Sequence, residues 1–232
     1  MIDAVKELFQ LVFLRIAVIF FNCIEYCKVV YYYYSNKPFR KVDTSLLKYY
    51  LFNSPFKISK NFLIGKGAED IYAYGETPLT TFDLIIQRLN IQTTDLFVEL
   101  GCGRGRCCFW LQAFKGCDVL GIEWVPEFVE IANEISEKNH LKNINFVCQD
   151  MLTTDFSNAT IIFLYGTCLE DEIIDQLIKK FSQLKKECRI ITVSYSLLDY
   201  SKGFFEIEDQ FSARFTWGIG EVFIHRVKEK RH

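Results

Sequence analysis

The chain has 232 residues, half of them hydrophobic, and carries a formal net charge of −2 at pH 7. This length and apolar content exclude an intrinsically disordered chain and predict one domain of ordinary size with a short extension, while the charge balance gives no strong signal of a nucleic-acid partner. Nine cysteines, an odd number without a CxxC pair, indicate reduced thiols in the cytoplasm and predict neither a disulfide framework nor a metal site.

The N-terminal residues 1–34 form the most hydrophobic segment, and its purest window runs from Leu8 to Ile24. A membrane-spanning helix needs about 20 apolar residues, whereas this window is shorter and is interrupted by Gln10, Arg15 and Asn22. Two interpretations stay open: an anchor or interfacial helix at a membrane surface, or a helix that packs on the rest of the chain or on a partner. If the segment spans a membrane, the basic residues after it predict that the C-terminal domain lies on the cytosolic side.

Residues 35–94 form a second region, in which the pattern up to residue 73 predicts no definite element. A helix is predicted over residues 80–89, where apolar side chains fall on one face. Thr80 and Asp83 stand at the spacing of a capping box, so we expect them to begin this helix.

Short apolar runs alternate with amphipathic helices after Asp95. Strands are predicted over 95–100, 118–124, 144–150, 160–166 and 189–197, and helices over 106–114, 126–138 and 170–184. This alternation predicts an α/β fold with a parallel sheet that is covered on both faces. Residues 211–227 are predicted to form a terminal antiparallel hairpin joined through Gly218 and Gly220, and the connection over 198–210 is too short for a full covering helix.

The loop after the first predicted strand, "VELGCGRGR" from Val98 to Arg106, is rich in glycine. In a parallel sheet, ligands bind beyond the carboxyl ends of the strands, and glycines let a ligand lie against main-chain N–H groups at the start of a helix. The third glycine of the dinucleotide-binding pattern would fall at Arg106, so this loop departs from that pattern. Glu99 stands instead two residues before Gly101, where a carboxylate repels a pyrophosphate and attracts an ammonium group.

Two further acids end the next two predicted strands. Glu123 stands where an acid can accept hydrogen bonds from both hydroxyls of a ribose. Asp150 can accept from the exocyclic amine of adenine, while the backbone N–H of Met151 donates to a ring nitrogen. An ammonium group, a ribose and an adenine at three successive strand ends describe S-adenosylmethionine.

These motifs resemble those of class I, Rossmann-like S-adenosylmethionine-dependent methyltransferases over residues 95–227. The resemblance implies a seven-stranded, mostly parallel sheet with a terminal antiparallel hairpin, preceded by a helical N-terminal extension. Residues 95–232 would then form the cofactor-binding methyltransferase domain, with the cofactor-covering loop in the region before it. The residues expected to bind the cofactor are Tyr74, Thr77, Glu99, Gly101, Gly103, Gly105, Glu123, Trp124, Asp150 and Met151.

The stretch "AYGETPLTTFDL" upstream of the loop resembles the non-SET histone lysine methyltransferases, the disruptor of telomeric silencing family. That resemblance implies that Tyr74 and Thr77 close over the methionine end of the cofactor. The family carries Asn-Asn-Phe where this chain has residues 165–167, Tyr-Gly-Thr, and a glutamine in place of Arg106. The hydrophobic N-terminus and a glycine loop that ends in Gly-Arg resemble the membrane-anchored lysine methyltransferases of mitochondria and prokaryotes.

The methyl acceptor expected from these resemblances is a protein lysine or a similar amine. An amine must lose its proton to act as a nucleophile, and an aromatic, partly dry channel favours the neutral form. Tyr165 and Tyr195, at the ends of the fourth and fifth predicted strands, are the candidates for that channel. Two alternatives stay open: a methyltransferase of a small molecule or lipid, and a membrane-associated protein that binds S-adenosylmethionine without chemistry.

Overall fold

The computed structural model describes residues 2–201 and 203–228, with the side chains of Phe9 and of Val12 onward in the first helix. The helices are α1 (Ile2–Tyr33), α2 (Lys37–Tyr50), α3 (Pro55–Lys66), α4 (Leu79–Gln87), α5 (Arg106–Lys115), α6 (Pro126–Lys138), α7 (Asp171–Phe181) and α8 (Leu197–Tyr200). The strands are β1 (Leu96–Leu100), β2 (Asp118–Glu123), β3 (Ile144–Cys148), β4 (Ile161–Leu164), β5 (Arg189–Val193), β6 (Phe205–Phe215) and β7 (Gly218–Val227).

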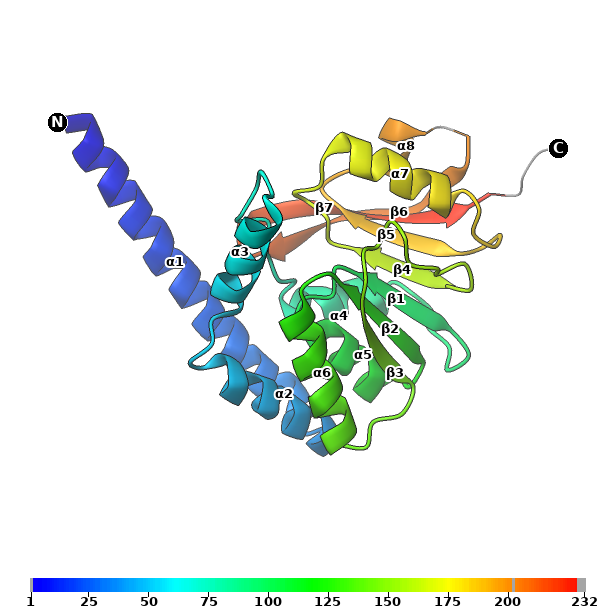
Figure 1. Ribbon diagram of the computed structural model, residues 1–232, viewed down its shortest axis with the longest axis horizontal. Coiled ribbons are helices and arrows are strands. Elements are labelled where there is room, and N and C mark those ends of the chain that lie inside the picture. The colour runs from blue at the N-terminus through cyan, green and yellow to red at the C-terminus, as the bar shows by residue number, and fades with distance from the viewer. Residues whose placement is uncertain (1, 202, 229–232) are drawn as a thin grey trace.

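The seven strands form one sheet in the order β3-β2-β1-β4-β5-β7-β6 (Figure 1). Strands β1 to β5 are parallel, and β7 is antiparallel to both of its neighbours. This arrangement confirms the predicted Rossmann-like, mostly parallel sheet with a terminal antiparallel hairpin. The strand order reverses at β1, between β2 and β4, so the carboxyl end of β1 is the point where such sheets bind ligands.

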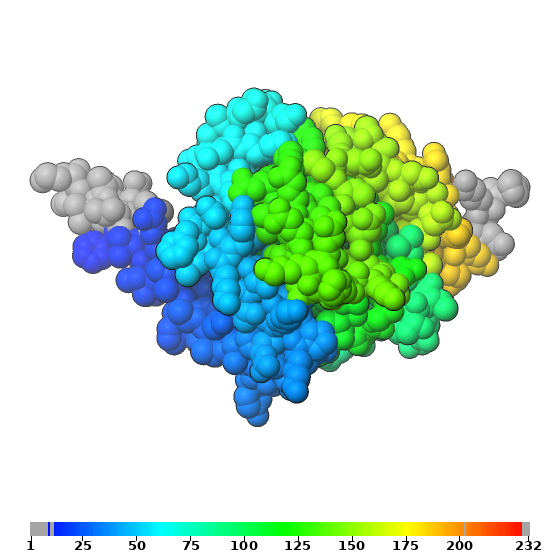
Figure 2. Space-filling view, turned by 60° about the horizontal axis from the view of Figure 1, so that its bottom comes forward, coloured from blue at the N-terminus to red at the C-terminus, as the bar shows by residue number. Residues whose placement is uncertain are grey.

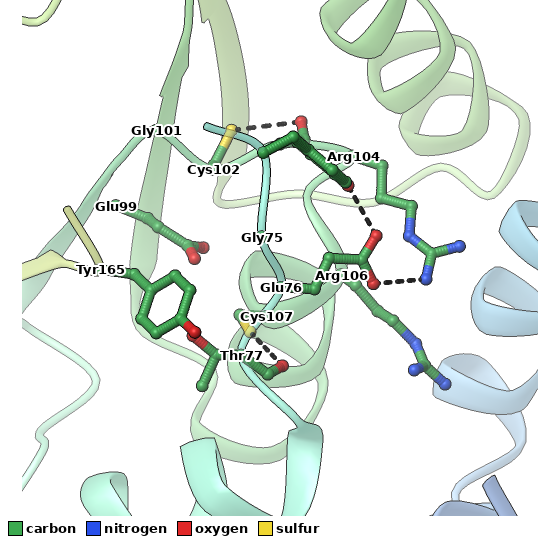
Figure 3. Close-up of a pocket in the computed structure, with 12 residues that line it drawn as sticks. Gly75, Glu76, Thr77, Glu99, Gly101, Cys102, Arg104, Arg106, Cys107 and Tyr165 are labelled. Atoms are coloured by element: carbon green, nitrogen blue, oxygen red, sulfur yellow. Dashed lines mark hydrogen bonds and ion pairs between the residues drawn. The ribbon is translucent and has the colours of Figure 1, made fainter. Parts of the chain in front are cut away.

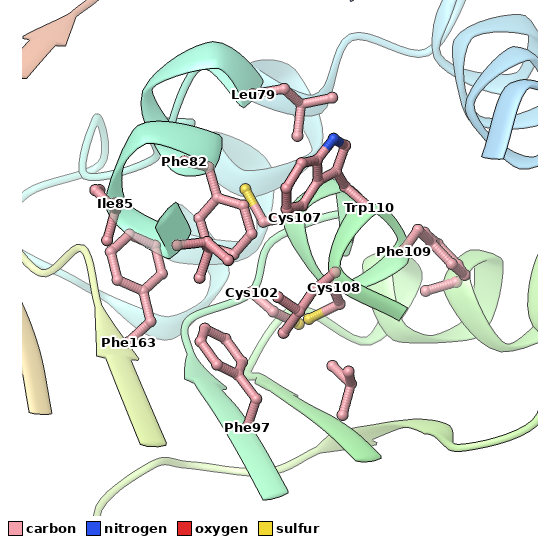
Figure 4. Packing of buried hydrophobic residues seen from close by; sticks show 14 of the residues in the cluster. Leu79, Phe82, Ile85, Phe97, Cys102, Cys107, Cys108, Phe109, Trp110 and Phe163 are labelled. Atoms are coloured by element: carbon pink, nitrogen blue, oxygen red, sulfur yellow. The ribbon is translucent and has the colours of Figure 1, made fainter. Parts of the chain in front are cut away.

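The sheet separates two clusters of buried side chains. Along β1, Phe97 faces one cluster and Val98 the other, because successive side chains of a strand point to opposite faces. Helices α4, α5 and α6 cover the first face, whereas α7 and α8 cover the second. Figure 4 shows the first face, where Phe82 of α4 packs against Trp110 of α5 and Phe163 of β4, with ring centroids 5.7 and 5.4 Å apart. The second face is thinly covered, as predicted, since α8 has only four residues.

The N-terminal helix α1 lies partly on the body of the protein and partly away from it (Figure 1). Near its end, Val29 and Tyr33 are buried in the same cluster as α4 and α5, and the ring of Tyr33 lies 5.5 Å from that of Trp110. Further from the sheet, apolar side chains such as Phe13 and Ile19 are exposed. Among the described residues, no helix combines the length and the apolar character that crossing a membrane requires.

Residues 37–66, for which the sequence pattern predicted no element, form α2 and α3. Helix α2 contacts α5 and α6, and it buries Phe39, Val42 and Leu46. In the space-filling view, the blue to cyan N-terminal residues gather on one side of the molecule, against the green segment that contains α6 (Figure 2). The N-terminal helices therefore lie over the part of the fold that holds the glycine loop.

The predicted capping box at the start of α4 is wrong. The helix begins at Leu79 after Pro78, and no side chain caps it. Thr80 donates through its backbone N–H and its hydroxyl to the carboxylate of Glu25 in α1, at 2.9 and 2.8 Å. Asp83 accepts from the hydroxyl of Tyr33, 2.8 Å away. Both side chains thus form hydrogen bonds with residues of α1 instead of capping α4. The local spacing of the sequence cannot reveal these long-range partners.

The terminal hairpin differs from the prediction at its start and at its turn. Strand β6 begins at Phe205, six residues before the predicted start at residue 211. The turn consists of Thr216 and Trp217, while Gly218 and Gly220 already belong to β7. Strand β6 pairs with β7 along almost the whole length of β6.

Candidate functional site

Two adjoining cavities lie at the carboxyl ends of β1 and β4. The larger has a volume of about 340 Å³ and is lined by α3, by the segment 72–75, by the ends of β1, β2 and β4, and by the turn between β6 and β7. The smaller, about 30 Å³, lies between the segment 74–77 and the glycine loop (Figure 3). Five residues line both cavities: Tyr74, Gly75, Gly101, Gly103 and Tyr165. The predicted residues of the covering loop, the glycine loop and β4 therefore meet in one place.

The glycine loop follows a path that only glycine takes easily. Gly103 and Gly105 have φ angles of +54° and +74°, in the left-handed region. A Cβ atom on Gly103 would lie 3.1 Å from the ring of Tyr74, and one on Gly105 would collide with the ring of Phe146. The absence of a side chain at Gly103 thus lets the ring of Tyr74 pack directly against the backbone of the loop.

Glu99 is a buried carboxyl group that points into the smaller cavity, toward Tyr165 and Thr77 (Figure 3). Its side chain accepts a hydrogen bond of 3.0 Å from the thiol of Cys108, a weak donor. Burial and the nearby charge of Glu123 raise the pKa of Glu99 to about 8, although the Cys108 contact lowers it. A ligand ammonium group would favour the charged form of this carboxyl group.

Glu123 fastens the glycine loop to the end of β2. Its Oε2 accepts from the backbone N–H of Gly103 at 2.8 Å, and its Oε1 accepts from the N–H groups of Trp124 and Val125 at 2.8 and 2.9 Å. Burial raises the pKa of Glu123 despite these three backbone donors, which lower it. A carboxylate offers about four acceptor positions, so room remains for a ligand hydroxyl. Glu123 and Trp124, both expected from the sequence to bind the cofactor, line the larger cavity.

Asp150 and Met151 stand in the turn after β3. Met151 lines the larger cavity, whereas Asp150 lines neither and accepts from the backbone N–H of Leu152 through Oδ1, at 2.8 Å. The sequence placed both at the cofactor, and the structure brings Met151 to the cavity directly.

The covering loop is tied to the glycine loop by ionic and polar contacts. The hydroxyl of Tyr74 donates to Oε1 of Glu76 at 2.6 Å. Nη2 of Arg104 donates to Oε2 of the same carboxylate, also at 2.6 Å (Figure 3). Burial raises the pKa of Glu76, but Arg104 and the Tyr74 hydrogen bond outweigh it and lower the pKa overall. The carbonyl of Thr77 accepts from the thiol of Cys107 at 3.9 Å. Glu76 and Arg104 were not predicted as site residues, although Glu76 lies within the motif that carried the resemblance.

Arg106 connects the glycine loop to helix α2. Its Nε and Nη2 donate to the two carboxylate oxygens of Asp43 at 2.7 and 2.9 Å, and the hydroxyl of Tyr34 donates to the same carboxylate at 2.9 Å. Asp43 is fully buried. Burial lowers the pKa of Arg106, but Asp43 outweighs it and raises the pKa overall. Since 63 residues separate the partners, no local signal predicted this pair.

Three stacked rings form what we call the aromatic wall: Tyr165, Phe215 and Trp217. The ring of Phe215 stacks on Tyr165 at 5.5 Å and on Trp217 at 5.2 Å, and Nε1 of Trp217 donates to the Tyr165 hydroxyl at 2.6 Å. Tyr165 and Trp217 line the larger cavity together with Tyr72. Trp217 was missed because it belongs to a hairpin turn that is distant in sequence.

The structure does not bring Tyr195 to the aromatic wall. Its ring lies 5.9 Å from that of Tyr200, among the side chains that α7 and α8 cover. It lines neither cavity. The backbone at Ser194 has a φ of +74°, so the chain leaves β5 through a sharp bend that the predicted strand over 189–197 did not include.

Known proteins share these features over parts of the chain. The family model described as the ANTKMT methyltransferase domain matches residues 99–202. The histone-lysine N-methyltransferase, H3 lysine-79 specific, of Dictyostelium discoideum is 30% identical over 182 residues, which cover 69% of this chain and 10% of that protein. A probable (S)-tetrahydroprotoberberine N-methyltransferase 2 of Papaver bracteatum is 25% identical over 151 residues, which cover 64% of this chain and 41% of that one.

A solved structure shares the fold. The RNA methyltransferase from Salinibacter ruber, in complex with S-adenosyl-L-homocysteine, matches with a TM-score of 0.55 and 20% identity, over 68% of this chain and 97% of that one. The chain thus spans nearly the whole length of this structure but only a part of each curated relative.

Proposed function

We propose that this chain, a class I S-adenosylmethionine-dependent methyltransferase, transfers a methyl group to an amine nitrogen of a protein, with a lysine side chain as the acceptor. The observation that carries the proposal is the aromatic wall, which stands beside the cavity of Glu99 and shares Tyr165 with it. The proposal is also supported by the similarity of this chain to a protein named as a histone-lysine N-methyltransferase.

The residues of the two cavities fit the cofactor. Glu99, whose strongest partner is a thiol, would take the ammonium group, while Tyr74 and Thr77 cover the methionine end. Glu123 would accept from the ribose, and the adenine would lie against Trp124 and Met151, within reach of Asp150. The bound cofactor supplies an electrophilic methyl group on a sulfonium.

The aromatic wall would prepare the acceptor amine. Transfer to nitrogen needs a neutral amine aligned with the methyl group more than it needs a strong base. The rings of Tyr165 and Trp217 keep part of the larger cavity apolar, and an apolar surrounding lowers the pKa of an amine by disfavouring its charged form. The Tyr165 hydroxyl already accepts from Trp217, so it can direct its own proton or its second lone pair toward the acceptor.

A labelling experiment tests the proposal. The purified chain is incubated with cell lysate and S-adenosylmethionine that carries a radioactive methyl group, and Glu99→Ala serves as the control that should not transfer. We expect label in protein, on lysine after hydrolysis. Label in the organic extract alone would instead support a small-molecule or lipid acceptor. Two observations favour this alternative: the apolar lining of the larger cavity and the similarity to the N-methyltransferase of Papaver bracteatum. Cofactor binding without any transfer would point to a non-catalytic binding protein.

We further propose that the protein acts in the cytoplasm. The nine cysteines of the chain are free, which fits a reducing compartment. The exposed apolar side chains of α1, such as Phe13 and Ile19, offer a surface for a membrane or a partner protein. Flotation with lipid vesicles that is unchanged in a Phe13→Ser, Ile19→Ser variant would contradict a membrane role for this helix.

A further inference from the structure

The ammonium group of Lys180, in α7, reaches across to the turn that follows β3. Its Nζ donates to three backbone carbonyls, those of Thr154 at 2.7 Å, Leu152 at 2.8 Å and Met151 at 3.2 Å. An ammonium group has three protons, so these contacts use all of them. Nζ also lies 4.5 Å from the centre of the Phe156 ring, within the range of a cation–π contact.

The turn that Lys180 holds is itself tightly wound around Asp150. The carbonyl of Asp150 accepts from the N–H groups of Thr153 and Thr154 at 3.0 Å and from the Thr154 hydroxyl at 2.7 Å. One carboxylate oxygen of Asp150 accepts from the N–H of Leu152. Within this turn the carbonyls of residues 151, 152 and 154 all point toward Nζ of Lys180.

This turn carries the adenine end of the cavity. Met151, whose carbonyl binds Lys180, also lines the larger cavity, and Asp150 precedes it. Lys180 lines neither cavity, so it touches the turn only from behind. Three carbonyls brought together repel one another unless a cation lies between them, so the turn depends on this ammonium group for its shape.

We propose that Lys180 is a positioning residue for adenine recognition: it holds the turn so that Asp150 accepts from the exocyclic amine while the N–H of Met151 faces the ring. This inference rests on the cofactor placement proposed above. Without the ammonium group the three carbonyls turn toward water, and the carboxylate of Asp150 moves with them. Affinity for the ribose and methionine parts, which Glu123 and Glu99 hold, is then largely kept, while discrimination at the adenine amine is lost.

The test compares two ligands on intact protein by titration calorimetry: S-adenosylhomocysteine and S-inosylhomocysteine. In the second ligand a carbonyl oxygen replaces the exocyclic amine and the neighbouring ring nitrogen carries a proton, so it matches neither the Asp150 acceptor nor the Met151 donor. A hydrogen bond to a charged carboxylate corresponds to roughly a tenfold to hundredfold preference of the wild type for the adenosyl ligand. Lys180→Met keeps the apolar stem over Phe156 and removes all donors, and we expect it to reduce the preference to less than about threefold. Lys179→Met, on the exposed side of the same helix, is the matched control and should keep the wild-type preference.

The outcomes separate this inference from its premise. A Lys180→Met protein that melts at a lower temperature but keeps the wild-type preference overturns the positioning role and leaves only a structural one. If that variant does not fold, Lys180→Gln, which keeps two donors, should lose part of the preference, and an unchanged preference overturns the inference. A wild-type protein that binds neither ligand overturns the proposed cofactor, and one that binds both equally overturns the role of Asp150 and with it that of Lys180.

Discussion

The buried carboxyl group of Glu99 predicts that cofactor binding strengthens as pH rises toward 8. Burial raises its pKa to about 8, so the free protein carries this group mainly protonated at pH 6 and 7. An ammonium ligand needs the ionised form, and ionising it costs about 1.4 kcal/mol for each pH unit below the pKa. Affinity for S-adenosylhomocysteine should therefore rise about tenfold between pH 6 and pH 7 and about fivefold between pH 7 and pH 8, and level off above pH 8.

Titration calorimetry at pH 6, 7 and 8 measures this dependence directly. Measurements in buffers of different ionisation enthalpy should also detect nearly one proton released on binding at pH 7. Glu99→Gln removes the titrating group, and we expect weaker binding that is almost independent of pH over this range. A dissociation constant that changes less than about twofold between pH 6 and 7 in the wild type would refute the reasoning.

The same pKa shift makes the stability of the free protein depend on pH in the opposite direction. Because the folded pKa of Glu99 lies above its usual value of 4.5, the folded chain binds more protons than the unfolded chain between pH 4.5 and 8. The contribution of Glu99 to the free energy of unfolding is therefore complete below pH 4.5 and is lost as pH rises through about 8. A bound ammonium ligand should recover it.

Three further predictions concern groups that the tertiary structure pairs. Arg106→Gln leaves the buried carboxylate of Asp43 without a cationic partner and should lower the free energy of unfolding, measured in urea, by about 3–5 kcal/mol. The double variant Arg106→Gln, Asp43→Asn should recover part of this loss, and equal losses in the single and the double variant would contradict the role of the ion pair. Trp217→Phe keeps the ring stack but removes the hydrogen bond that Trp217 donates to Tyr165. We therefore expect kcat to fall while the Kd of the cofactor stays within about twofold of the wild-type value. A changed Kd with an unchanged kcat would instead assign Trp217 to cofactor binding. Burial lowers the pKa of His225 to about 4, so stability should fall as pH drops from 6.5 toward 4, and an equally steep fall in His225→Gln would remove this residue from the explanation.

The sheet, and the edge of the sheet at which the candidate site residues lie, could be predicted because both follow from local pattern and topology. Apolar runs of strand length alternating with amphipathic helices specify parallel strands, and the carboxyl ends of such strands meet at one edge. Glu99 and Glu123 each end one of these strands, so their meeting required no knowledge of side-chain packing. Tyr74 was placed only through the resemblance of its motif to known methyltransferases.

The contacts that join distant segments were decided by the tertiary structure alone. Arg106 could be seen to break a glycine pattern, but Asp43, its partner, lies on a helix that the sequence did not reveal. Trp217 and Lys180 likewise act on segments 52 and 26 or more residues away. Periodicity along the chain shows which face of a helix is apolar. It does not show which polar groups the charged side chains of that helix will contact, because those contacts depend on how all the elements pack together.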